Sequence, residues 1–229
     1  MRLQHLTGLF LTVLALLTAT PGHARDWRTT VEMTPEGGYL IGNPDAPVKV
    51  IEYFSLTCSH CRTFATDVQP QLEADYVASG KANLELRNFV LNPADLAASL
   101  LMRCGTAVSA VQLYRKAFAD QRTLFSGLGR ITAEEATKIS STPLAARPGM
   151  LATTIGIDRW FQGQGLAAGR AQSCLKDPER QQDLVSLRVQ GAQKYGIDGT
   201  PTLIVNGSVV PGHDWNALET AVKAALKGQ

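Results

Sequence analysis

The sequence predicts an α/β sheet protein whose sheet-forming parts are separated by a helical insertion. Strand-type patterning occurs towards both ends of the chain, whereas residues 94–185 have mostly helical patterning and no convincing strand. The chain has 229 residues, of which 45% are hydrophobic and 18% charged, so it is long enough to bury a sizeable core. We therefore expect one globular domain that carries an insertion.

The first residues have the pattern of a secretory signal peptide. Arg2 supplies a short positive segment, residues 6–19 form an apolar core, and Gly22-His23-Ala24 places small residues at the cleavage positions. That core is too short to cross a bilayer, which needs about 20 residues, although an uncleaved anchor is the alternative. We expect residues 1–24 to be a signal peptide cleaved near Ala24 and the mature protein to be exported and soluble.

The first sheet-forming part is expected to be a strand–helix–strand unit. Residues 25–47 are polar and contain Pro44 and Pro47, which predicts a short irregular lead-in. Residues 48–54 are nearly continuous in apolar and β-branched character, as in a strand buried on both faces. From Ser59 onwards apolar residues recur at helical spacing, and residues 84–90 alternate as a second strand.

The insertion and the C-terminal part follow. Pro143 and Pro148 divide residues 93–185 into several short helices, and Asp95 is a candidate N-cap for one of them. An amphipathic helix is expected over residues 179–195, ended by Gly196. The turn pair Asn206-Gly207 then joins two short strands as a hairpin, and Asp214 is placed to cap a final helix.

Two cysteines occupy the point where the first strand leads into its helix. A helix N-terminus presents free N–H groups and a positive dipole, so the Cys58 thiol should have a lowered pKa. One helical turn brings Cys61 within bonding distance, and the intervening Ser59 and His60 set the local charge and geometry. The pattern predicts thiol–disulfide chemistry and no metal.

Other uses of this cysteine pair fit less well. Covalent haem attachment needs a histidine after the second cysteine, where Arg62 stands. A structural zinc site needs four ligands, and the mature chain offers only His60 and His213 besides cysteines. A cysteine hydrolase would pair a cysteine with His213, for which the sequence gives no support.

The remaining cysteines, Cys104 and Cys174, lie in the predicted insertion. Export places them in an oxidising compartment, and four cysteines allow three connectivities. The short spacing of Cys58 and Cys61 favours Cys104 with Cys174 as the second pair, and two buried free thiols are the alternative. The formal net charge of +2 and the lack of a basic cluster make nucleic acid an unexpected partner.

Two segments resemble the DsbA-type thiol:disulfide oxidoreductases of the bacterial periplasm. Residues 50–55 running into Cys58-Ser59-His60-Cys61 form the first segment, and residues 196–202 form the second. The resemblance implies a thioredoxin fold interrupted by an inserted helical domain. It assigns residues 25–92 and 186–229 to the thioredoxin-like domain and residues 93–185 to the insertion, with no cofactor and a periplasmic location.

The resemblance also implies roles for individual residues. Pro201 would be a cis-proline packed against the cysteine pair, and the Thr200 backbone would pair with an extended substrate segment. Glu52 would be a partly buried acid of raised pKa that exchanges a proton with Cys61. Cys104 and Cys174 would form the structural disulfide found in one branch of the family. An ordinary trans bond before Pro201 and a solvent-facing Glu52 are the alternatives.

The resemblance implies a monomeric dithiol oxidase that donates the Cys58–Cys61 disulfide to reduced secreted proteins. A membrane disulfide-generating oxidase would then reoxidise it. Ser59 stands where many relatives have proline, a departure within the dipeptide that tunes the oxidising strength. An isomerase or reductase uses the same chemistry, and a periplasmic Cu(I) carrier is the alternative from another class.

Overall fold

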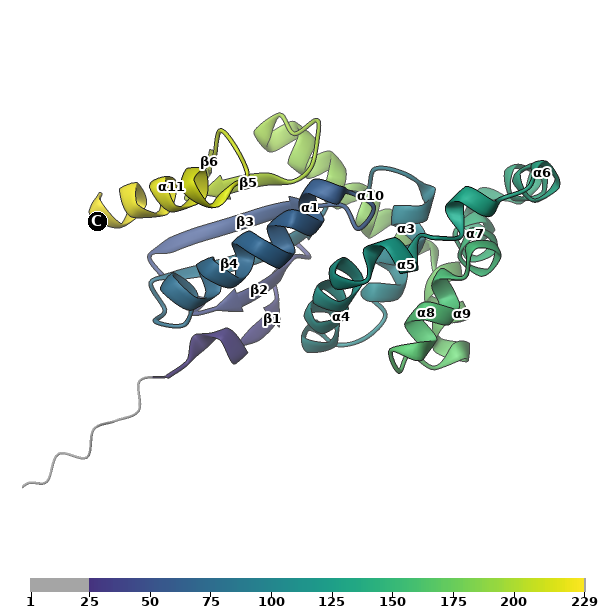
Figure 1. Ribbon diagram of the computed structural model, residues 1–229, viewed down its shortest axis with the longest axis horizontal. Coiled ribbons are helices and arrows are strands. Elements are labelled where there is room, and N and C mark those ends of the chain that lie inside the picture. The colour runs from purple at the N-terminus through teal and green to yellow at the C-terminus, as the bar shows by residue number, and fades with distance from the viewer. Residues whose placement is uncertain (1–24, 229) are drawn as a thin grey trace, which may run out of the picture.

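The computed structural model describes residues 25–228 (Figure 1). The expected signal peptide, with Arg2 and the cleavage position near Ala24, lies outside the described residues. Between residues 25 and 228, no helix combines the length and hydropathy needed to cross a bilayer.

A six-stranded sheet forms the centre of the fold, in the order β1-β2-β4-β3-β5-β6. Its strands are β1 (Val31–Met33), β2 (Tyr39–Gly42), β3 (Val48–Phe54), β4 (Ala82–Asn88), β5 (Thr202–Val205) and β6 (Ser208–Val209). β3 and β4 are parallel, and the other neighbours are antiparallel. Val50 of β3 pairs with Leu84 on one side and Val205 on the other, so both halves of the chain share the centre of the sheet.

The expectation of an irregular lead-in over residues 25–47 is wrong. This segment contains a 3-10 turn (Trp27–Thr29) and the hairpin strands β1 and β2, and β2 pairs with β4. All four residues of β2 are buried. A strand this short has little periodicity of its own, and its stability comes from a partner strand more than 40 positions away.

Helices cover both faces of the sheet (Figure 1). One face carries α11 (Trp215–Lys227) and the helical segment 59–77, made of α1 (Ser59–Thr63), a π-helical turn (Phe64–Val68), α2 (Gln69–Leu72) and a second π-helical turn (Glu73–Val77). The Tyr76 hydroxyl donates a hydrogen bond to Glu219 at 3.2 Å and so links these two helical elements.

The opposite face of the sheet carries α10 (Pro178–Tyr195). A Cβ at Gly191 would lie 2.7 Å from the Tyr53 ring, so glycine permits this close approach. Successive strand residues face opposite sides of a sheet. Tyr53 therefore faces α10, and Glu52 faces the side of the helical segment 59–77.

The insertion consists of short helices, as expected. They are α3 (Pro93–Met102), α4 (Ala107–Ala119), α5 (Gln121–Leu124), α6 (Ala133–Ser141), α7 (Arg147–Ile155), α8 (Ile157–Gly163) and α9 (Ala168–Lys176). The N-cap of α3 is Asn92 and not the expected Asp95, which is fully buried in the first turn. Asp95 instead accepts hydrogen bonds from the loop before Cys58 and from Leu91.

α10 joins the insertion to the sheet. It contacts both α3 and β4, and the boundary expected between residues 185 and 186 lies within it. Gly196 ends it in the left-handed conformation, as expected. The expected hairpin is also present, with Asn206 and Gly207 at positive φ, and Asp214 caps α11 through the Ala217 N–H.

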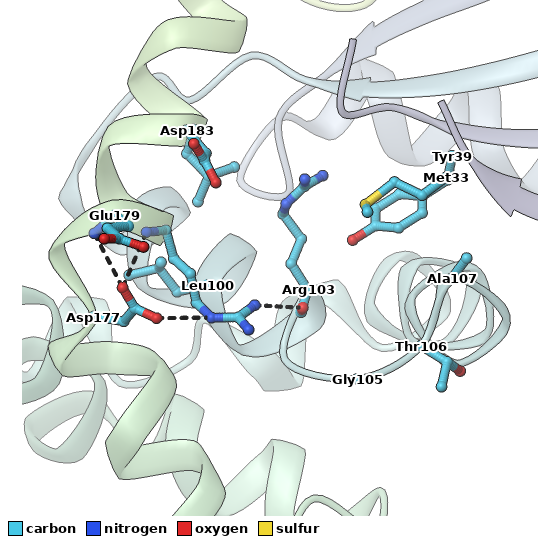
Figure 2. Close-up of a pocket in the computed structure, with 12 residues that line it drawn as sticks. Met33, Tyr39, Leu100, Arg103, Gly105, Thr106, Ala107, Asp177, Glu179 and Asp183 are labelled. Carbon is cyan, nitrogen blue, oxygen red and sulfur yellow. Dashed lines mark hydrogen bonds and ion pairs between the residues drawn. The ribbon is translucent and has the colours of Figure 1, made fainter. Parts of the chain in front are cut away.

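A hollow of about 450 Å³ lies where β1, β2, the α3–α4 turn and the start of α10 meet (Figure 2). Arg180 of α10 pairs with Asp177 and donates a hydrogen bond to the main-chain oxygen of Arg103 at 3.3 Å. The Arg103 guanidinium in turn lies 4.9 Å from the Tyr39 ring centroid. These contacts tie the insertion to the N-terminal hairpin, away from the cysteine pair.

Candidate functional site

Cys58 and Cys61 lie at the start of the helical segment 59–77, where β3 ends. Cys58 is the N-cap of α1, and its Sγ accepts the Cys61 N–H at 3.5 Å. Cys58 is half-buried and Cys61 is fully buried, and both are free thiols. One sulfur is therefore available to a reactant while the other is protected from solvent.

The two thiols have opposite ionisation properties. A hydrogen bond from the Cys61 thiol is the largest cause that lowers the pKa of Cys58 to about 5, and the N–H groups of Cys61 and His60 lower it further. Burial raises the pKa of Cys61 well above its ordinary value, and the nearby Cys58 and Glu52 add to this effect. At neutral pH, Cys58 is a thiolate and Cys61 is a thiol.

The loop before β5 lies against Cys58. The Thr200–Pro201 peptide bond is cis, and the Cys58 Sγ lies 3.2 Å from the Thr200 carbonyl oxygen. β5 pairs antiparallel with β3, and Thr202 pairs with Tyr53. This pairing brings Thr200 beside Cys58, which lies 142 positions earlier in the sequence. The sheet thus places the Thr200–Pro201 loop against the half-buried sulfur.

Glu52 lies beneath the cysteine pair and is more buried than expected, with no exposed surface. Desolvation raises the pKa of its carboxyl to about 8, opposed by a hydrogen bond from the Tyr114 hydroxyl to Oε2 at 2.6 Å. Its Oε1 has no hydrogen-bond partner among the residues that the structure describes. At neutral pH this carboxyl holds a proton close to Cys61.

Tyr114 belongs to α4 of the insertion, and sequence reasoning missed it. It is one of several apolar and aromatic residues at helical spacing in α4, and these residues pack in the core. Nothing in its local pattern separates a tyrosine that contacts Glu52 from an ordinary core tyrosine. Only the packing of α4 beneath the site gives its hydroxyl a role.

His60 and Ser59 are exposed on the first turn of α1. The contribution of His60 to the lowered pKa of Cys58 comes from its main-chain N–H. Its imidazole ring meets the ring of His213 edge to face, with centroids 5.4 Å apart. His213 comes from the loop between β6 and α11, so its place beside the site follows from the sheet and not from local sequence.

The loop between β3 and α1 is held by side chains of the insertion and by Asn92, the N-cap of the insertion's first helix. Asp95 accepts the Leu56 N–H at 2.9 Å, and Asn92 donates to the Thr57 hydroxyl at 2.9 Å. The Gln121 side-chain amide donates to the carbonyl oxygens of Leu56 and Cys58. Sequence reasoning identified none of these contacts, because polar residues at helix starts are usually caps.

Cys104 and Cys174 form a disulfide, which confirms the expected pairing. Their Cα atoms are 5.8 Å apart, and the bond joins the end of α3 to α9 across 70 positions of sequence. The disulfide therefore cross-links the insertion and is separate from the Cys58–Cys61 pair.

Residues 34–224 match the family described as thioredoxin. The chain belongs to the thioredoxin family. Among solved structures, this thioredoxin-family chain is similar to a protein-disulfide isomerase from Novosphingobium aromaticivorans, with 26% identity and a TM-score of 0.76 over 82% of this chain and 96% of that one. Wolbachia pipientis alpha-DsbA1 has the same fold, with 20% identity and a TM-score of 0.64 over 86% of this chain and 94% of that one.

Curated relatives of this chain are named as protein-disulfide oxidoreductases. A Rickettsia bellii protein named as a protein-disulfide oxidoreductase is 26% identical over 84% of this chain. The chain spans 66% of that protein's length and 60% of the length of a Rickettsia felis relative of the same name. The family match and the similar solved structures together show a DsbA-type fold, in which a helical insertion interrupts a thioredoxin fold.

Proposed function

We propose that this protein is a thiol:disulfide oxidoreductase that donates its Cys58–Cys61 disulfide to reduced proteins. The observation that carries the proposal is the contrast between the two thiols: Cys58 is half-exposed with a pKa of about 5, and Cys61 is buried with a raised pKa. A stable Cys58 thiolate favours the reduced form of the pair, so the disulfide is a good oxidant.

The proposed reaction has two exchange steps. A substrate thiolate attacks the Cys58 Sγ of the disulfide, forms a mixed disulfide with Cys58, and releases the Cys61 sulfur. A second substrate thiolate then attacks the substrate sulfur of the mixed disulfide and releases Cys58 as a thiolate. The substrate dithiol loses two electrons and the Cys58–Cys61 pair gains them, and the low pKa of Cys58 makes it a good leaving group.

Glu52 is assigned to proton transfer with Cys61. The sulfur of Cys61 must gain a proton when it leaves, because its buried surroundings raise the pKa of the thiol. The Glu52 carboxyl, with a pKa of about 8, holds a proton at neutral pH and is near enough for its charge to affect Cys61. It can supply that proton and recover another from water.

The Thr200–Pro201 loop is assigned to substrate binding. Thr200 presents main-chain atoms beside Cys58, where an extended segment can form backbone hydrogen bonds as an added strand. An apolar groove of about 550 Å³ opens beside Thr57, and Leu128, Ile131 and Ile139 are among its lining residues. An apolar groove can bind exposed apolar segments of another polypeptide, and incompletely folded proteins expose such segments. The groove therefore supports reduced secreted proteins as substrates.

Disulfide donation leaves the pair reduced, so each cycle needs an oxidant. We assign this role to a membrane disulfide-generating oxidase, and we assign the protein itself to the periplasm as a monomer. The name of one similar protein, Disulfide bond formation protein D of Bacillus subtilis, supports disulfide formation as the reaction.

The decisive experiment mixes the oxidised protein with an unfolded polypeptide that contains two reduced cysteines. We expect one disulfide to form in the polypeptide as two thiols appear in the protein, and Cys58→Ser to abolish the reaction. A potential in equilibrium with glutathione as low as about −270 mV would contradict disulfide donation and favour a reductase. Stoichiometric copper in protein purified without oxygen would instead favour a Cu(I) carrier.

A further inference from the structure

The conformation of the loop before Cys58 is fixed partly by side chains of the helical insertion. Within the loop, the Cys58 N–H bonds to the Ser55 oxygen at 3.1 Å, and the Thr57 N–H bonds to the Ser55 hydroxyl at 3.2 Å. Three further hydrogen bonds come from the insertion: Asp95 accepts the Leu56 N–H, and Gln121 donates to two carbonyl oxygens.

Gln121 is placed to act on the geometry of Cys58. Its Nε2 lies 2.8 Å from the Leu56 oxygen and 2.9 Å from the Cys58 oxygen, so each of its two hydrogens has an acceptor. Gln121 is only 7% exposed, and water therefore competes little for either bond. A single amide group thus holds the carbonyls on both sides of Thr57.

The orientation of these carbonyls determines where the sulfur lies. The Cys58 backbone is extended, with φ −82° and ψ 123°, and this places its Sγ to accept the Cys61 N–H. A bond to the Cys58 carbonyl fixes ψ of that residue, and a bond to the Leu56 carbonyl fixes the peptide plane before Thr57. The same N–H groups that meet the sulfur are among the causes of the low pKa of Cys58.

We propose that Gln121 is a positioning residue through which the helical insertion holds the Cys58 sulfur over the helix N-terminus. The inference rests on the proposed function and deepens it: the insertion takes part in setting the reactivity of the nucleophile. Loss of the Gln121 amide leaves the Leu56 carbonyl without this donor and the Cys58 carbonyl with the Arg62 N–H alone. The Cys58 carbonyl then has more freedom to turn, and the sulfur spends less time near the N–H groups that stabilise its charge.

The loop is expected to stay folded without Gln121. Asp95 and Asn92 retain their bonds to Leu56 and Thr57, and the Cys58 oxygen keeps a second donor, the Arg62 N–H at 3.2 Å. A change in reactivity can therefore be separated from a loss of folding.

The test compares Gln121→Leu and Gln121→Met, which have a similar side-chain size and no donor, with a matched control, Asp158→Asn. Asp158 is also a buried polar residue of the insertion, 5% exposed, but it bonds to Thr153 and the Arg159 N–H. Two quantities are measured: the Cys58 pKa from ultraviolet thiolate absorbance, and the equilibrium constant with glutathione.

We expect both Gln121 variants to raise the Cys58 pKa. The equilibrium constant for oxidation of glutathione by the Cys58–Cys61 disulfide should fall about threefold to tenfold at pH 7. Asp158→Asn should lower stability and leave both quantities unchanged. A low wild-type Cys58 pKa that persists in the folded Gln121 variants would overturn this inference, whereas an ordinary wild-type Cys58 pKa would overturn the proposed function.

A measurement on the wild-type protein tests the contact without a substitution. Both Gln121 side-chain amide protons should exchange slowly with solvent, because both are buried and bonded. Fast exchange of either proton would overturn the inference, including in the case where the two variants do not fold.

Discussion

The ionisation of Cys58 predicts a specific pH dependence for the redox potential of the pair. The disulfide carries no titrating sulfur, whereas the reduced form carries Cys58 with a pKa of about 5 and Cys61 with a raised pKa. Below pH 5, reduction by two electrons takes up two protons. Between pH 5 and 8 it takes up one, because Cys58 stays ionised while Cys61 keeps its proton.

The size of the effect follows from these pKa values. One proton per two electrons changes the potential by about 30 mV per pH unit, and two protons change it by about 60 mV. At pH 7 a thiol with a pKa of about 5 favours its thiolate by roughly 100 to 1, which corresponds to about 60 mV of added oxidising strength. Cys58 is only half-buried and solvent screens its interactions, so about 60 mV is an upper value.

The same shift has a defined sign for stability. The folded-state pKa of Cys58 is below that of an unfolded cysteine, which is about 8.5. Its contribution to the stability of the reduced protein is therefore complete above about pH 8.5 and is lost as the pH falls through about 5. The oxidised protein lacks this contribution at every pH.

The assay is equilibration with glutathione buffers between pH 4 and 8, followed by trapping of free thiols and mass measurement. We expect the plot of potential against pH to change slope near pH 5. In Cys61→Ala, the Cys58 pKa should rise, because the Cys61 thiol is the largest cause of its lowering. A slope that corresponds to two protons up to pH 8 in the wild-type protein would refute the reasoning.

Three further predictions follow from the site, the insertion and the groove. Glu52→Gln should slow disulfide exchange at pH 7, because the proton held for Cys61 is lost. It should also raise the free energy of unfolding at pH 7 by up to about 4 kcal/mol, since the raised pKa destabilises the fold increasingly between about pH 4.3 and 8; exchange kinetics and denaturation at two pH values check both effects. Cys104→Ser with Cys174→Ser should lower the free energy of unfolding by roughly 4 kcal/mol for this loop length while redox activity remains, as denaturant titration and the polypeptide assay would show. Leu128→Ser should slow oxidation of an unfolded polypeptide but not of glutathione, and equal slowing of both would remove the groove from substrate binding.

Local pattern was enough to predict the elements on which the site is built. The strand over residues 48–54 was predicted with its observed bounds, because a run of β-branched and aromatic residues needs no distant partner to be recognised. The helix beginning at Ser59, the hairpin at Asn206-Gly207 and the cap at Asp214 carry equally local signals.

Local pattern failed where the stabilising partner is distant. β1 and β2 were missed because their stability comes from pairing with each other and with β4. Asp95 was expected to be a cap and is instead a buried acceptor, since the loop before Cys58 supplies its hydrogen-bond donors. In both cases the deciding atoms belong to another part of the chain.

The sequence by itself determined the chemistry available at the candidate site, because the spacing of Cys58 and Cys61 and their place between a strand and a helix are local properties. Only the tertiary structure decided how the two thiols differ. The burial of Cys61, the approach of Thr200 and the contact of Tyr114 with Glu52 depend on strand pairing and helix packing across the whole chain. Desolvation and hydrogen bonding act through space, so the ionisation of these groups is a property of the assembled fold.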